Sequence, residues 1–178
     1  MSCFIRLAVE DDLPRLPEIE RSAAEAFRQT DIALSVVSAV TPAEAWRGPL
    51  LAQTLWVVDD GQGHPVAFLG AEAVGPDLHI LELDVALERQ GQGLGRRLLR
   101  HVLDWARDAG FQAATLKTFR DVAWNGPFYG SLGFEELDTS ELPERLAAIL
   151  AKEAEHGLDP ARRCAMRLDL AAWRTADA

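Results

Sequence analysis

One succession of elements, a strand, a glycine-rich turn, a helix and a second strand, constrains the fold of this chain most. The apolar run Leu78–Val85 leads into the turn Arg89–Gly95, and apolar residues then recur at helical spacing over Gly93–Ala109. A second apolar run, Phe111–Phe119, follows the helix. A strand–helix–strand crossover of this length joins parallel strands and is almost always right-handed. The sequence therefore predicts an α/β fold that contains a parallel pair of strands.

The strands on the N-terminal side of this pair are predicted to be antiparallel. Thr54–Asp59, Pro65–Val74 and Leu78–Val85 are separated only by the short turns Asp60–Gly63 and Gly75–Asp77. Because such turns cannot contain a crossover, these strands form an antiparallel meander. Thr30–Gln53 shows no clear period and is predicted to be a mobile loop with a short helix. The other predicted elements are the strand Phe4–Val9, a helix from Asp11 to about Arg28, a short helix near Val122–Leu132, the strand Phe134–Leu137, the helix Ser140–His156 and the strand Arg163–Leu170.

Composition indicates a soluble globular protein, since 48% of the residues are apolar and 26% are charged. The apolar stretches are shorter than the roughly 20 residues of a membrane span, and no signal peptide is read, so we expect a cytoplasmic protein without a membrane partner. The formal charge of −10 disfavours nucleic acid as a partner. Cys3 and Cys164 belong to no Cys/His cluster, and no metal is expected. We predict one mixed-sheet domain over residues 1–178.

The glycine-rich turn has the chemistry of a phosphate-binding loop. Gly91, Gly93 and Gly95 stand at alternate positions and allow the backbone to approach a ligand closely. The helix that follows begins with free N–H groups and a partial positive charge. An arginine cluster accompanies it in an otherwise acidic chain: Arg89, Arg96, Arg97 and Arg100. A solvated basic helix face would give the same pattern, but arginines in a first turn oppose the helix dipole unless an anion is bound, which favours the phosphate site.

Two motifs in this region resemble those of one enzyme superfamily. Gln90-x-x-Gly93-x-Gly95 resembles the Q/R-x-x-G-x-G/A acetyl-CoA signature of the GNAT superfamily of N-acetyltransferases, whereas its spacing fits neither a dinucleotide fingerprint nor a P-loop. The segment Trp124–Phe134, with the sequence WNGPFYGSLGF, is similar to the N…FYxxLGF segment of the same superfamily. The motifs and the order of elements cover about Leu78 to Phe134, and the flanks agree in outline.

The resemblance implies a GNAT-like domain with helices on both faces of the sheet and an acetyl-CoA site where the parallel strands splay apart. The backbone at the end of the Leu78–Val85 strand would bind the pantetheine arm, and the glycine turn would wrap the pyrophosphate. A polar residue before the FYxxLGF segment would help to position the cofactor, although its spacing to Tyr129 is shorter than in the common family pattern. The implied cofactor-binding residues are Leu83, Asp84, Val85, Gln90, Gly91, Gln92, Gly93, Leu94, Gly95, Arg96 and Asn125.

Three residues are candidates for proton transfer. Tyr129, the only tyrosine, falls where the family often places a general acid, and its alternative role is that of a packed aromatic. His79 and Glu82 are both open as the base that deprotonates the amine, and strand alternation puts them on opposite faces. His79 lies four residues before Leu83, where some relatives carry a catalytic Glu. Each has an equally open structural role, as a strand-start histidine or a carboxylate paired with arginine. Glu20, on the first predicted helix, is a candidate for recognising a cationic acceptor.

The resemblance predicts an enzyme that transfers an acetyl group from acetyl-CoA to a primary amine. We expect direct attack in a ternary complex, since neither cysteine lies near the motifs to form an acyl-enzyme. The alternative is a module of the same fold that binds acyl-CoA as a sensor without turnover. The acceptor would be a small-molecule or peptide amine, which the sequence does not identify further, and a homodimer stays open as the oligomeric state.

Overall fold

The computed structural model describes residues 2–174, which cluster into two compact units. The first unit comprises the residues up to Glu72 together with Ile80–Val102, and the second comprises Ala73–His79 together with the residues from Leu103 onward. The chain therefore passes between the units within strands β3 and β4 and within helix α4, which are defined below. Among the described residues, no helix is long and apolar enough to cross a membrane.

Seven strands in the described residues form a mixed sheet in the order β1-β2-β3-β4-β5-β7-β6. β4 and β5 are parallel, as predicted, and β1–β2, β2–β3, β5–β7 and β6–β7 are antiparallel. The fold class predicted from the sequence is thus confirmed. The strands are β1 Phe4–Leu7, β2 Leu55–Asp59, β3 Pro65–Val74, β4 Asp77–Val85, β5 Ala113–Phe119, β6 Glu135–Glu136 and β7 Arg163–Asp169.

The predicted helices are present with altered ends. The first predicted helix is an α-helix flanked by 3₁₀ turns (η), and Thr30–Gln53 contains three short helical segments where one was expected. The helices are η1 Glu10–Arg15, α1 Leu16–Ala24, η2 Glu25–Gln29, α2 Leu34–Val37, η3 Ala43–Trp46, α3 Arg47–Leu51, η4 Leu87–Arg89, α4 Leu94–Asp108, α5 Gly126–Gly130 and α6 Glu144–Glu155.

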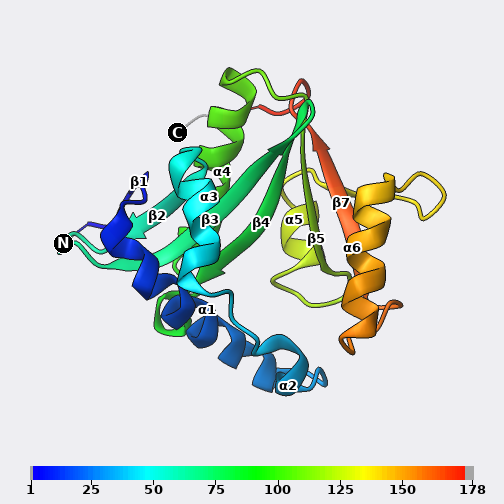
Figure 1. Ribbon diagram of the computed structural model, residues 1–178, viewed down its shortest axis with the longest axis horizontal. Coiled ribbons are helices and arrows are strands. Elements are labelled where there is room, and N and C mark those ends of the chain that lie inside the picture. Colours follow the sequence, from blue (N-terminus) through cyan, green and yellow to red (C-terminus); the bar gives the residue numbers. More distant parts are fainter. Residues whose placement is uncertain (1, 175–178) are drawn as a thin grey trace. The chain divides into compact units, whose positions relative to one another are not determined.

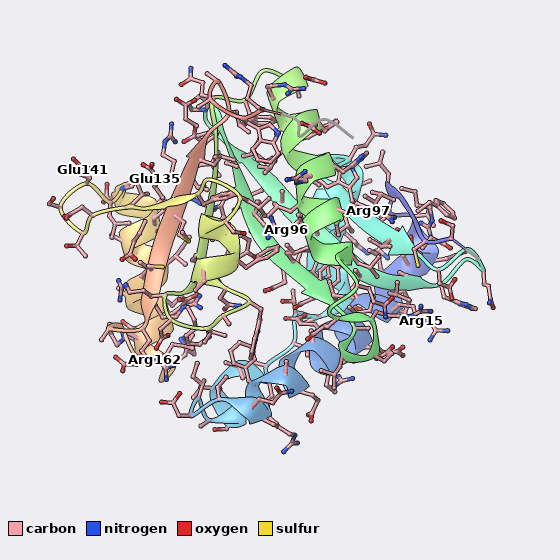
Figure 2. The ribbon with its side chains drawn as sticks, turned by 180° about the vertical axis from the view of Figure 1, so that it is seen from behind. Arg15, Arg96, Arg97, Glu135, Glu141 and Arg162 are labelled. Carbon is pink, nitrogen blue, oxygen red and sulfur yellow. The ribbon has the colours of Figure 1, made fainter. Side chains whose placement is uncertain are left out.

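The first unit has a hydrophobic core between its strands and the N-terminal helices. α1 contributes Leu16 and Ile19, which pack with Leu55, Val57 and Phe68 of the sheet. Figure 1 shows α1 and α3 on the near side of β2 and β3, and Figure 2, seen from behind, shows α4 on the other side. The first half of α4 buries its own apolar stripe there, made of Leu94, Leu98, Leu99 and Val102. Helices therefore cover both faces of the sheet, as predicted.

Trp46 gives order to a segment that has no clear periodicity in the sequence. Its side chain is only 3% exposed, and its ring meets that of Phe68 edge to face with 5.2 Å between the centroids. The ring also lies over Gly70 of β3, where a Cβ atom would overlap Cζ3 of the indole. The contact depends on an aromatic residue and a glycine that are distant in the sequence, so periodicity could not reveal it.

The second unit is organised around β5. Its seven residues pair with β7 from Ala113–Asp169 to Phe119–Arg163, and on the other side its first three pair with Asp77–His79. α6 runs in front of β7 in Figure 1. Glu153 of α6 accepts hydrogen bonds from Arg163 of β7 at 2.8 and 3.1 Å and pairs with Lys117 of β5 at 2.8 Å. These cations hold the pKa of Glu153 below its usual range, and the ion pairs attach the helix to both strands.

The contact between Trp46 and Gly70 predicts a large effect of a small substitution. Gly70→Ala should lower the free energy of unfolding by about 1–3 kcal/mol, because the added methyl group has no space in a packed core. Gly48→Ala is the matched control, since a Cβ at Gly48 of α3 meets no atom within 4 Å. Urea unfolding of both variants checks this, and equal stabilities would contradict the described position of Trp46.

Candidate functional site

The turn after β4 has the backbone conformation that the glycine spacing predicted. Gly91 and Gly93 adopt left-handed φ angles of 74° and 77°, which residues with a side chain rarely adopt. A Cβ at either position would meet no atom of the chain within 4 Å, so the space beside the turn is open. Gly95 serves a different purpose, since a Cβ there would lie 3.4 Å from Cγ2 of Val85 and the helix packs closely on the strand end.

α4 begins directly after this open turn. The amide of Arg97 donates to the carbonyl of Gly93 at 3.0 Å. In general, the first amides of a helix lack a carbonyl partner within the helix. Free amides together with the helix dipole attract anions such as a phosphate.

Side chains fix the turn to the neighbouring elements. The Gln90 side-chain amide donates to the Val85 carbonyl at 3.0 Å, and that of Gln92 donates to the Glu88 carbonyl at 3.3 Å. From α1, the Ser22 hydroxyl oxygen accepts a hydrogen bond from the backbone amide of Leu87 at 3.0 Å. Gln90 and Gln92, both predicted to bind the cofactor, therefore use their side chains to hold the turn in shape.

The arginines of the turn do not all point to one place. Arg97 donates to the Cys3 carbonyl at 2.7 Å and so connects α4 to the N-terminal residues. Figure 2 shows Arg96 and Arg97 leaving α4 on different sides. Arg100 is half-buried, and its Nε has no hydrogen-bond partner among the residues that the structure describes. The arginines predicted to form one cluster therefore point in different directions, and Arg97 makes a structural contact.

Three carboxyl groups of the first unit meet beside the C-terminal half of β4. Glu20 comes from α1, whereas Glu82 and Asp84 come from β4, and one oxygen of each lies within 4.8 Å of the others. We call these residues the acid cluster. The backbone amide and hydroxyl of Thr41 donate to Glu20 at 2.8 and 3.3 Å. Oδ2 of Asp84 is buried and has no hydrogen-bond partner among the described residues.

Burial and the repulsion of neighbouring charges favour the protonated forms of Glu20 and Asp84. Burial raises the pKa of Glu20 from its ordinary 4.5 to about 7, although the hydrogen bonds from Thr41 lower it in part. Burial also raises the pKa of Asp84 well above its usual range, and the charges of Glu82 and Glu20 raise it further. At neutral pH the empty cluster therefore holds at least part of a proton.

His79 lies in the second unit and is buried, with only 1% of its surface exposed. Its Nδ1 is 2.9 Å from the Thr115 hydroxyl, and its Nε2 has no hydrogen-bond partner among the described residues. Burial lowers the pKa of His79 to about 4, so the ring is neutral. This burial is compatible with the structural role that the sequence left open for His79.

Asn125 and Tyr129 also belong to the second unit. Asn125 directly precedes α5, and Tyr129 lies within it. The Asn125 side-chain oxygen accepts a hydrogen bond from the Phe119 amide at 3.4 Å, and its carbonyl accepts one from the Tyr129 amide at 3.0 Å. Tyr129 is 9% exposed, and its ring packs at 5.1 Å from Phe128 and 5.7 Å from Phe134. Both residues help to attach α5 to β5, and the packed-aromatic role of Tyr129 is compatible with a reactive hydroxyl.

Most of the predicted cofactor-binding residues form one continuous segment of the first unit. The half-buried ones are Leu83, Asp84, Val85, Gln90, Gly95 and Arg96; Gly91, Gln92 and Gly93 are exposed, and Leu94 is buried. The sequence did not reveal that the side chain of Asp84 joins Glu20 and Glu82. Two acids at alternate positions of a largely apolar strand, Glu82 and Asp84, were the available signal, because alternate residues share a face.

Comparison with known proteins identifies relatives of this architecture. The family model described as Acetyltransferase (GNAT) family matches residues 17–134. The ribosomal-protein-S18-alanine N-acetyltransferase of Escherichia coli has a similar structure, with a TM-score of 0.65, 19% identity and coverage of 99% of each chain. N-acetylglutamate synthase of Neisseria gonorrhoeae, complexed with coenzyme A and N-acetyl-glutamate, gives a TM-score of 0.69 and 19% identity over 96% of this chain and 35% of its own. PaiA N-acetyltransferase of Thermoplasma acidophilum, in complex with coenzyme A, gives a TM-score of 0.67 and 16% identity over 95% of this chain and 99% of its own.

The raised pKa of Glu20 predicts that the wild-type protein loses stability as the pH rises. Between about pH 4.5 and 7 the folded state keeps a proton on Glu20 that the unfolded chain releases, so unfolding becomes more favourable through this range. Glu20→Gln removes this titration, so the variant should lose less stability over the same range. Urea unfolding at a series of pH values tests this. Glu18→Gln, at an exposed position of the same helix, should follow the wild type, and parallel curves for all three proteins would show that Glu20 titrates normally.

Proposed function

This chain belongs to the acetyltransferase (GNAT) family, and we propose that it transfers an acetyl group from acetyl-CoA to a primary amine by direct attack in a ternary complex. The observation that carries the proposal is the backbone of the turn after β4, where Gly91 and Gly93 are left-handed beside open space directly before α4. Structural neighbours in complex with coenzyme A support acyl-CoA as the donor. The family match extends through both units, which supports a single acetyltransferase domain.

The backbone of this segment is proposed to bind the cofactor. The amides from Gly91 to Arg96 would bind the pyrophosphate, and the backbone of Leu83–Val85 would bind the pantetheine arm. The Val85 carbonyl already accepts a hydrogen bond from Gln90, so it contributes to the shape of the turn. Asn125 is proposed to assist in positioning the cofactor.

Two proton transfers accompany the reaction. The amine nitrogen attacks the thioester carbonyl carbon, so that a C–N bond forms and the C–S bond breaks. We assign the protonation of the departing thiolate to Tyr129. For the base we prefer Glu82 to His79, because Glu82 is half-buried within the acid cluster whereas His79 is enclosed. The structural neighbours include a ribosomal-protein-S18-alanine N-acetyltransferase and an N-acetylglutamate synthase, so we propose a small-molecule or peptide amine as the acceptor without naming it.

The first test of this function is a substitution in the turn. Gly93→Val should weaken CoA binding at least about tenfold, because a branched side chain would fill the open space and resist the left-handed φ. Gly63→Val is the control, since Gly63 has a φ of 85°, also faces open space and lies in the turn between β2 and β3. Calorimetric titration with CoA measures both. Equal affinity in the folded Gly93→Val protein would place the CoA site elsewhere.

The second test separates an enzyme from an acyl-CoA sensor. Tyr129→Phe keeps the ring packed against Phe128 and Phe134, so CoA affinity should hold, while kcat should fall by roughly 10–10³ if the phenol protonates the thiolate. A free thiol has a pKa of about 8.5, so the leaving thiolate needs less protonation as the pH rises. The loss of kcat in the variant should therefore shrink toward alkaline pH. The measurement is kcat against pH with the best amine from a panel. Unchanged kcat would leave Tyr129 a packing residue only, and a wild-type protein that binds CoA but acetylates no amine would favour the sensor.

A further inference from the structure

The acid cluster is not explained by the cofactor-binding role of β4. That role uses the backbone of Leu83–Val85, yet the side chain of Asp84 is directed into a group of carboxyls and leaves Oδ2 buried without a partner. A buried carboxylate oxygen without a hydrogen bond destabilises the folded state. A bound cation that donates a hydrogen bond to this oxygen would remove the destabilisation.

The cluster is built from elements that are fixed in position. α1 is attached to the turn after β4 by the hydrogen bond between Ser22 and Leu87, and this contact brings Glu20 to the strand. The Thr41 amide and hydroxyl orient the Glu20 carboxylate from the segment between α2 and η3. Arg21, on the same helix as Glu20, lowers the pKa of Glu20 less than burial raises it.

The spacing of the three carboxylates suits an ammonium group. An R–NH₃⁺ group has three N–H donors in tetrahedral directions, and with N···O distances of about 2.8 Å it brings its three acceptor oxygens to about 4.6 Å from one another. The oxygens of Glu20, Glu82 and Asp84 lie within 4.8 Å of one another. We propose that these three carboxylates are the binding site for the acceptor amine, which enters as an ammonium ion. This inference rests on the proposed function, and it extends to Asp84 and Glu82 the role in recognising a cationic acceptor that the sequence suggested for Glu20 alone.

The same site would prepare the amine for reaction. A protonated amine has no lone pair for attack, so one N–H bond must break before the C–N bond forms. The proton passes to Glu82, the proposed base, as an O–H bond forms, and the amine keeps the electron pair. Glu20 lies beside Glu82 in the cluster, and because burial raises its pKa to about 7, Glu20 can take this proton from Glu82 and release it to solvent near neutral pH. The Arg21 and Glu82 charges and the Thr41 donors are the other groups that act on this equilibrium.

Binding of simple ions tests the site without knowledge of the natural acceptor. n-Butylammonium should raise the melting temperature of the wild-type protein in a saturable way, whereas tetramethylammonium, with the same charge but no N–H donor, should not. Asp84→Asn and Glu20→Gln should each weaken n-butylammonium binding at least about tenfold, because each removes a charge-assisted hydrogen bond. Glu18→Gln, on the exposed side of α1, is the matched control and should bind as the wild type does.

Further arms of the experiment distinguish the other outcomes. Equal effects of the two ammonium ions would show that the cluster attracts any cation by charge alone, and this would overturn the proposal. A saturable shift with MnCl₂ alone that excludes n-butylammonium would identify a metal site instead, and no shift with n-butylammonium would also refute the inference. Both acid variants should fold, because they remove buried charge, and urea unfolding of each variant checks this. If the wild-type protein did not bind CoA, the proposed function would be contradicted. The n-butylammonium measurement would still test the acid cluster by itself.

Discussion

Two side-chain hydrogen bonds hold together the part of the molecule on which the proposed activity depends. Gln90 binds the Val85 carbonyl, and Ser22 accepts from the Leu87 amide. The first bond closes the turn onto the end of β4, and the second attaches α1 to that turn. As a result, the left-handed glycines, the start of α4 and Glu20 of α1 are all positioned relative to one strand end. Loss of either bond would therefore disturb both the backbone of the glycine turn and the acid cluster.

The acid cluster lowers the stability of the unit in which it lies. Burying Glu20 and Asp84 beside Glu82 costs solvation and adds repulsion between like charges, and both effects appear as raised pKa values. The large apolar core formed by α1, η3 and the sheet tolerates this cost. Strained or poorly satisfied polar groups are common where a ligand is bound, because the ligand supplies the missing interaction.

The second unit contributes residues whose roles are closer to structure. His79 is enclosed between β4 and β5 with its ring near Thr115, and Asn125 links α5 to the end of β5. Gly126 permits this link, since a Cβ there would come within 2.5 Å of the Arg120 carbonyl oxygen. The glycine and asparagine of the WNGPFYGSLGF segment therefore shape the connection that presents Tyr129. A motif residue can be required for the position of a catalytic candidate without taking part in the chemistry.

The sequence by itself determined the fold class, the parallel pair and the conformation of the glycine turn. These follow from hydrophobic periodicity, connection length and the dihedral freedom of glycine, all of which are local along the chain. Only the tertiary structure decided that Glu20 joins Glu82 and Asp84, that Arg97 turns to the Cys3 carbonyl, and that His79 is enclosed. The acid cluster depends on how α1 docks beside β4, and the burial of His79 on the pairing of β4 with β5. Local pattern carries no information on such contacts, because they join residues that are distant in sequence and their energies appear only when the chain has packed.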